Sequence, residues 1–120
     1  MLKVYQCEKC GKTIVSNKEL KEIVGWKELI ADSTDAAKEK HVPVVSKKCK
    51  TVKVDVGSVA HPMTEEHLIE WVALETEQGS QVKYLTPNSA PVCTFTLADG
   101  DKAVAVYAYC NLHSLWKTDI

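Results

Sequence analysis

The residue pattern at 51–56 constrains the fold of this chain more than any other feature. Val52, Val54 and Val56 alternate with Lys53 and Asp55. Successive side chains of a β-strand point to opposite faces, so this period of two predicts a strand with one buried face. A helix would need apolar residues every three or four positions instead.

Further segments after His41 are also typical of strands. They are short, rich in aromatic and branched residues, and cover 68–74, 81–85, 92–97 and 103–109. An Asp-Gly pair at 99–100 predicts a hairpin between the last two segments. Several short strands at this spacing predict an all-β fold, an immunoglobulin-like antiparallel β-sandwich.

Residues 1–38 differ from the rest of the chain. Cys7 and Cys10 enclose a knuckle-like turn, and the lysine- and glutamate-rich stretch that follows is interpreted as short strands and turns. Cap-type residues before two alanines at 32–38 predict a single helical turn at the junction. We therefore expect a small N-terminal domain at 1–38 and a β-sandwich domain at 39–120.

Composition excludes several classes of partner. The chain has 120 residues and a formal net charge of -1, whereas a nucleic-acid-binding protein usually carries a basic stripe. No apolar run is long enough to span a membrane, and the first residues lack the apolar stretch of a signal peptide. The expected location is therefore the cytoplasm, where an odd number of cysteines (five) argues against a disulfide framework.

Histidine and cysteine placement indicates a metal site. Five candidate donors stand in distinctive local contexts: His41, His61, His67, His113 and Cys110. The Cys-x-x-His spacing at 110–113 lets one turn present two donors to the same point. Prolines stiffen the chain beside His41 and His61. Any one of these residues alone would more often be a surface group or core filler, so it is their combination that favours a metal.

Three segments carry a resemblance to a known family. They are 39–44 (EKHVPV), 56–63 (VGSVAHPM) with 67–71 (HLIEW), and 110–116 (CNLHSLW). In this order they resemble the signature segments of the superoxide reductase family, which includes desulfoferrodoxin and neelaredoxin. The resemblance runs from about residue 34 to residue 117.

The resemblance implies one mononuclear iron on an immunoglobulin-like sandwich. Four imidazoles would lie in the equatorial plane and one thiolate would be axial, and by position these ligands are His41, His61, His67, His113 and Cys110. Glu39 matches the glutamate that closes the sixth position in the ferric state, and Lys40 matches the lysine beside the open position. The implied reaction takes superoxide, one electron and two protons to hydrogen peroxide. A rubredoxin-type electron donor and a homodimer are also implied.

Elementary chemistry agrees with these implications. Five donors exceed the four of a structural zinc site, and imidazole with thiolate suits a redox metal such as iron or copper. A lysine near an open position would attract a small anion such as superoxide. Without the resemblance, however, Glu39 and Lys40 read as part of a solvated charge run with Lys38.

The sequence departs from the family pattern in two places. Two-iron members bind a second iron through four cysteines of a desulforedoxin-like N-terminal domain, and here only Cys7 and Cys10 are present, with no cysteine between Cys10 and Cys49. That centre is expected to be absent, unless two protomers share a metal through these cysteines. Ser114 replaces the family's usual glycine, which would affect the turn after His113 and backbone donation to the Cys110 sulfur.

Two thiols lie outside the motifs, and two other functions compete with the main one. Cys49 and Cys93 are interpreted as ordinary strand thiols. A cupredoxin-type electron carrier would use two histidines, one cysteine and a methionine, but no methionine follows His113. A zinc-binding interaction module using Cys7 and Cys10 is the second alternative.

Overall fold

The computed structural model describes residues 2–21 and 23–120 and divides into two compact units, Met1–Ile30 and Ala31–Ile120. This division falls eight residues before the domain boundary expected at 38/39. The reason lies in Asp32, whose amide donates to the carbonyl of Leu115 at 2.9 Å. Its carboxylate accepts the amide of Lys117 at 3.1 Å. These hydrogen bonds attach the segment that begins at Ala31 to the last strand of the second unit.

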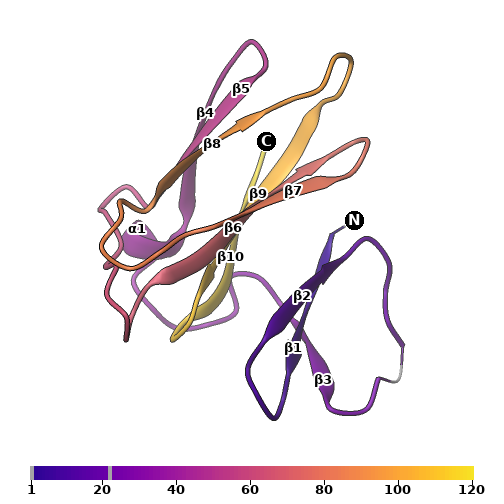
Figure 1. The fold of residues 1–120 in the computed structure, drawn as a ribbon, viewed down its shortest axis with the longest axis vertical. Helices are drawn as coiled ribbons and strands as arrows, with labels where there is room; N and C mark the ends of the chain where they lie inside the picture. The colour runs from indigo at the N-terminus through magenta and orange to yellow at the C-terminus, as the bar shows by residue number, and fades with distance from the viewer. Residues whose placement is uncertain (1, 22) are drawn as a thin grey trace. The chain divides into compact units, whose positions relative to one another are not determined.

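The first unit is a three-stranded antiparallel sheet. Its strands are β1 (Lys3–Cys7), β2 (Thr13–Ser16) and β3 (Trp26–Leu29), in the order β2-β1-β3 (Figure 1). Val4 and Tyr5 of the central strand are buried. The interpretation of this region as short strands and turns is confirmed.

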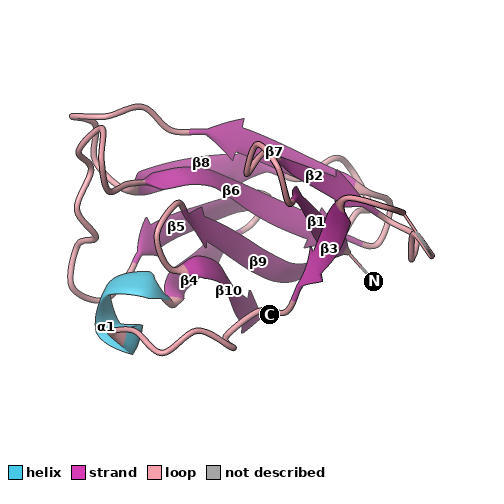
Figure 2. Cartoon of the chain, turned by 90° about the horizontal axis from the view of Figure 1, so that it is seen from below, coloured by secondary structure: helices cyan, strands magenta, loops and turns pink. Residues whose placement is uncertain are grey.

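The second unit is a sandwich of two antiparallel sheets with one short helix. Its elements are α1 (Lys38–His41), β4 (Pro43–Lys48), β5 (Thr51–Val56), β6 (Ile69–Thr76), β7 (Ser80–Tyr84), β8 (Val92–Thr96), β9 (Ala103–Cys110) and β10 (Ser114–Asp119). The four-stranded sheet has the order β10-β9-β6-β7, and the three-stranded sheet has the order β4-β5-β8. The predicted all-β antiparallel fold is confirmed. Figure 2 shows α1 as a single helical turn beside the strands.

The core lies between the two sheets and explains the alternation in the sequence. Val52, Val54 and Val56 of β5 are fully buried, while Thr51 and Lys53 are exposed. They share one cluster with Phe95 of β8 and with residues of the opposite sheet: Ile69, Val72, Leu74, Val106, Ala108 and Cys110. Each fully buried valine or leucine stabilises the fold by about 1.5–3 kcal/mol relative to an exposed one. Cys110 therefore belongs to the rigid core as well as to the candidate site described below.

The hairpin predicted across Asp99-Gly100 is wrong. β8 pairs with β5, whereas β9 pairs with β6 and β10, so the connection at 97–102 passes from one sheet to the other. Gly100 does take a positive φ of 79°. The Asp-Gly pair correctly indicates a turn, but a turn does not specify which strands will be partners.

The helical turn lies later than predicted. The expectation was 32–38, but α1 begins at Lys38, and Ala37 at its N-cap provides no side-chain hydrogen bond. Asp32, which was expected among the capping residues, has a φ of 62° and is bound to β10 instead. None of the helices among the described residues has the length and hydropathy needed to cross a membrane.

The two cysteines outside the motifs differ in environment. Cys93 lies in β8 as a strand thiol, and burial raises its pKa to about 11. Cys49 was expected to be a strand thiol too, but it occupies the turn between β4 and β5 with a φ of 55° and is exposed. Residues 47–51 include no Gly, Pro, Asn, Asp or Ser, so the usual sequence signals of a turn are absent there.

Candidate metal centre

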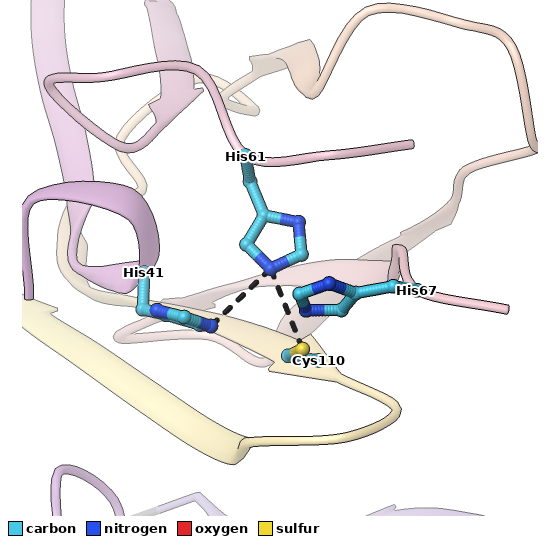
Figure 3. A group of neighbouring side chains, drawn as sticks. All are labelled: His41, His61, His67 and Cys110. Atoms are coloured by element: carbon cyan, nitrogen blue, oxygen red, sulfur yellow. Dashed lines mark hydrogen bonds between the residues drawn. The ribbon is translucent and has the colours of Figure 1, made fainter. Parts of the chain in front are cut away.

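Four of the expected donors come together at one end of the sandwich. His41 ends α1, His61 and His67 lie in the loop between β5 and β6, and Cys110 ends β9. One ligand atom from each lies within 4.8 Å of all the others (Figure 3). Three separate elements therefore converge on a volume that a single ion would fill.

The fifth expected donor lies at the same place. The Nδ1 atom of His113 is 3.2 Å from Nε2 of His41 and 3.8 Å from the sulfur of Cys110. The ring centroid of His113 is 5.1 Å from that of His67. All four histidines thus face one another, although they are separated by up to 72 positions in the chain.

The tautomers of His41 and His61 make this cluster incomplete without a cation. Nδ1 of His41 lies 2.6 Å from the carbonyl of Ala37, and Nδ1 of His61 lies 2.6 Å from the carbonyl of Pro62. A carbonyl only accepts, so each Nδ1 carries the proton and each Nε2 presents a bare lone pair. These two Nε2 atoms are 3.2 Å apart. Two lone pairs at that distance repel each other unless a positive ion lies between them.

His67 supplies a further atom that lacks a partner. Its Nε2 is buried and has no hydrogen bond within the described part of the chain. An unsatisfied buried nitrogen costs about 1–3 kcal/mol, so such atoms are rare in folded proteins. Coordination to a metal would remove this cost. The residues present therefore fit a bound metal ion.

Burial keeps these imidazoles in the neutral form that a metal requires. It lowers the pKa of His41 and of His67, and it lowers the pKa of His61 to about 4. The neighbouring imidazoles lower these pKa values further. Because a protonated imidazole cannot bind a metal, protons compete with the ion only in acidic solution.

The metal-free protein is expected to lose stability as the pH falls from 6.5 to about 4. In this window an unfolded chain binds a proton at His61, while the folded chain does not, so the free energy of unfolding decreases. Thermal unfolding of metal-free protein across this range measures the effect, with His61→Gln as the control that lacks the titrating group. Equal pH dependence of the two proteins would contradict the assignment.

The turn at 111–113 holds the Cys110 sulfur. Burial raises the pKa of the Cys110 thiol, while hydrogen bonds from the amides of Leu112 and His113 act in the opposite direction. Ser114 takes a φ of 64°, the conformation that glycine would adopt with less strain. Serine at this position therefore preserves the turn, and both backbone donations to the sulfur are present.

Asn111 fixes the loop that carries His67. This role was not predicted from the sequence. Its side-chain oxygen accepts the amide of Leu68 at 3.1 Å, and its side-chain nitrogen donates to the carbonyl of Glu66 at 2.9 Å. Thr64 closes the other side of the loop, since its hydroxyl accepts the amide of His67 at 3.1 Å. The only sequence signal was the position of Asn111 inside the Cys-x-x-His motif.

Trp116 is a second supporting residue that the sequence did not reveal. Its ring stacks on that of His41, with centroids 4.9 Å apart and an angle of 29° between the planes. Its indole nitrogen donates to the carbonyl of His113 at 2.9 Å. One buried side chain therefore orients two donor residues, as outer-shell groups commonly do at metal sites.

Glu39 and Lys40 precede His41 directly on α1, and both are exposed. The carbonyl of Glu39 accepts the amide of Val59 at 2.8 Å, which holds this backbone against the loop after β5. Besides burial, the positive charge of Lys40 lowers the pKa of both His41 and His67. The ammonium therefore lies close enough to act on imidazoles from two different segments.

Comparisons with known proteins agree with this geometry. The profile of the Desulfoferrodoxin family matches residues 33–119, a range that contains all five donors. A desulfoferrodoxin from Desulfarculus baarsii is 42% identical over 123 aligned positions, covering 98% of this chain and 96% of the relative. Another, from Clostridium acetobutylicum, is 50% identical over 93 positions, covering 77% and 71%. The crystal structure of the superoxide reductase from Treponema pallidum matches with a TM-score of 0.75 and 48% identity, and the match covers 78% of each chain.

Proposed function

The chain belongs to the desulfoferrodoxin family of superoxide reductases, and we propose that it reduces superoxide to hydrogen peroxide at a single iron. The ligands of this iron are His41, His61, His67, His113 and Cys110. The observation that carries the proposal is the pair of bare Nε2 atoms of His41 and His61, 3.2 Å apart and directed at the same point as the Cys110 sulfur.

Each element of the donor set has a chemical purpose. When bound, the iron supplies one electron and an open position for the substrate. Four neutral imidazoles leave the charge of the site to be set by Cys110, whose thiolate donates electron density more strongly than nitrogen or oxygen ligands. The side chains around the open position then attract the anion and deliver protons.

Lys40 attracts the substrate, and Glu39 is assigned as the residue that would bind the iron when no substrate is present. Superoxide is a small anion, so an exposed ammonium next to the site raises its local concentration and its rate of arrival. The same ammonium orients water for the transfer of the two protons that the product needs. Glu39 directly precedes Lys40 on α1, and we propose that its carboxylate would be a further ligand of the oxidised iron.

The direct test is metal analysis followed by rapid mixing of the reduced protein with superoxide. We expect one iron per chain, and one hydrogen peroxide formed per superoxide consumed without release of dioxygen. Dioxygen as a product would indicate dismutation instead. A protein that binds only zinc, or one with the strong blue absorption of a cupredoxin, would overturn the proposal in favour of one of the two alternatives.

Lys40→Ala is expected to slow the bimolecular reaction with superoxide by about tenfold, because electrostatic steering changes association rates by about 10–1000-fold. The dependence of this rate on ionic strength should weaken as well. Lys48→Ala is the matched control, since Lys48 lies at the end of β4 that is remote from His41. Equal rates for the two variants in stopped-flow mixing would remove Lys40 from the mechanism.

The proposal extends to the setting of the reaction. A rubredoxin-type protein would return the electron to the iron, and the active form would be a homodimer in the cytoplasm. Sedimentation at several protein concentrations tests the dimer. Reduction of the ferric protein by a purified rubredoxin tests the donor.

A further inference from the structure

The knuckle formed by Cys7 and Cys10 holds two thiols together. The amide of Cys10 approaches the sulfur of Cys7 at 3.5 Å, and the Cys10 thiol also hydrogen-bonds to that sulfur. The turn is closed at both ends: the amide of Cys7 donates to the carbonyl of Lys12 at 2.8 Å, and the amide of Gly11 donates to the carbonyl of Cys7 at 2.9 Å. The two sulfur atoms are therefore held next to each other by the backbone.

Among the described residues of this unit, no further donor completes a metal site with the two cysteines. The sequence has no other cysteine before Cys49 and no histidine before His41. Among the described residues, the group able to bind a metal lies in the second unit. A tetrahedral site needs four donors, and the knuckle offers two.

The environment of the knuckle suits a reactive dithiol. Cys7 is partly exposed and Cys10 is exposed. Hydrogen bonds from the Cys10 amide, the Cys10 thiol and the Lys9 amide lower the pKa of Cys7 and favour its thiolate. A thiolate is the form that attacks peroxides, and an accessible thiolate beside a second cysteine is the arrangement found in reversible redox sites.

We propose that Cys7 and Cys10 form a reversible intramolecular disulfide, with hydrogen peroxide as the oxidant. The Cys7 thiolate attacks one peroxide oxygen, so that an S–O bond forms and the O–O bond breaks. The released hydroxide takes up the proton lost from Cys7 and becomes water. The Cys10 sulfur then attacks the sulfur of Cys7, the S–S bond forms, and the oxygen leaves as a second water with the Cys10 proton.

The electrons balance without any further reagent. The two thiols lose two electrons and two protons, and one hydrogen peroxide becomes two waters. A reducing dithiol restores the pair by exchange. The oxidant is the product of the proposed superoxide reaction. The oxidation state of Cys7 and Cys10 would therefore respond to the hydrogen peroxide formed at the metal centre. The chemistry of the knuckle can nevertheless be tested with added peroxide, whether or not the chain reduces superoxide.

The test exposes the full-length, metal-loaded protein in its oxidised state to hydrogen peroxide and then labels the remaining free thiols. We expect labelling of Cys7 and Cys10 to fall by about tenfold or more while Cys49, the exposed control thiol, is largely unchanged. The mass of the peptide that contains both cysteines should fall by two hydrogens, and dithiothreitol should restore the label. In Cys10→Ser, a sulfenic-acid probe should mark Cys7. In Cys7→Ser, no such mark should appear at Cys10.

Three results would overturn the proposal. The first is a knuckle that keeps both thiols at peroxide levels that oxidise Cys49. The second is a disulfide between two chains, seen as a dimer on a non-reducing gel. The third is a metal bound by the knuckle, seen as a metal content above one per chain that returns to one in Cys7→Ser. Failure of superoxide reduction with a normal disulfide would instead contradict the proposed function alone.

Discussion

Cys110→Ser is expected to lower the affinity for iron by more than about 100-fold and to abolish the reaction with superoxide. Loss of a hydrogen-bond partner of a ligand already costs about 10–100-fold in metal affinity, so loss of the ligand itself should cost more. Serine is nearly the same size, and the amides of Leu112 and His113 can still donate to its oxygen. The defect should therefore lie in the chemistry of the site and not in the packing of β9.

Two measurements separate a loss of iron binding from a loss of stability. Equilibrium titration with ferrous iron gives the affinity, and thermal unfolding of the metal-free proteins gives the stability. Cys49→Ser, which removes an exposed thiol in the turn between β4 and β5, is the control and should match the unsubstituted protein in both. Full iron binding and retained superoxide reduction in Cys110→Ser would exclude Cys110 as a ligand.

The alternation at 51–56 and the branched and aromatic composition of four further segments predicted β5 to β9, whereas β4 and β10 were not predicted. The alternation was informative because the pattern and the structure share one physical cause. β5 alternates since its inner face contacts the opposite sheet, and its outer face contacts solvent. The partners of the strands were harder to predict. The turn at 99–100 is encoded locally by Asp-Gly, but the assignment of β8 and β9 to different sheets depends on β5 and β6, which are distant in sequence.

The side chains that converge at one end of the sandwich could be selected from the sequence, but the residues that orient them could not. His41 and Cys110 were informative only in combination with the other three histidines, because a single histidine or cysteine is more often a surface group or core filler. Asn111 and Trp116 have many possible roles in a sequence. Asn111 acts through the carbonyl of Glu66 and Trp116 through the ring of His41, and only the folded chain brings these segments near. The helical turn was misplaced for a similar reason, because Asp32 binds β10 and does not cap α1.

Gly57→Ala is expected to destabilise the second unit by about 1–3 kcal/mol and to weaken iron binding, although residue 57 is not a ligand. A β-carbon at this position would lie 2.7 Å from the carbonyl oxygen of Glu39, 3.0 Å from that of Val42 and 3.1 Å from the carbonyl carbon of Lys40. All three are backbone atoms, which cannot rotate away as a side chain can. The backbone of α1 must therefore move, and α1 carries His41 and Lys40.

The expected displacement affects the site from both sides. The amide of Val59 is hydrogen-bonded to Glu39, so the loop that leads to His61 moves together with α1. Each kcal/mol should lower the melting temperature by about 4–8 °C in a domain of this size. Gly79→Ala is the matched control, because a β-carbon there has no neighbour within 4 Å and its stability should change by no more than about 0.5 kcal/mol. Equal melting temperatures and equal iron affinities for the two variants would contradict the prediction. They would show that the close contact between Gly57 and α1 does not position His41.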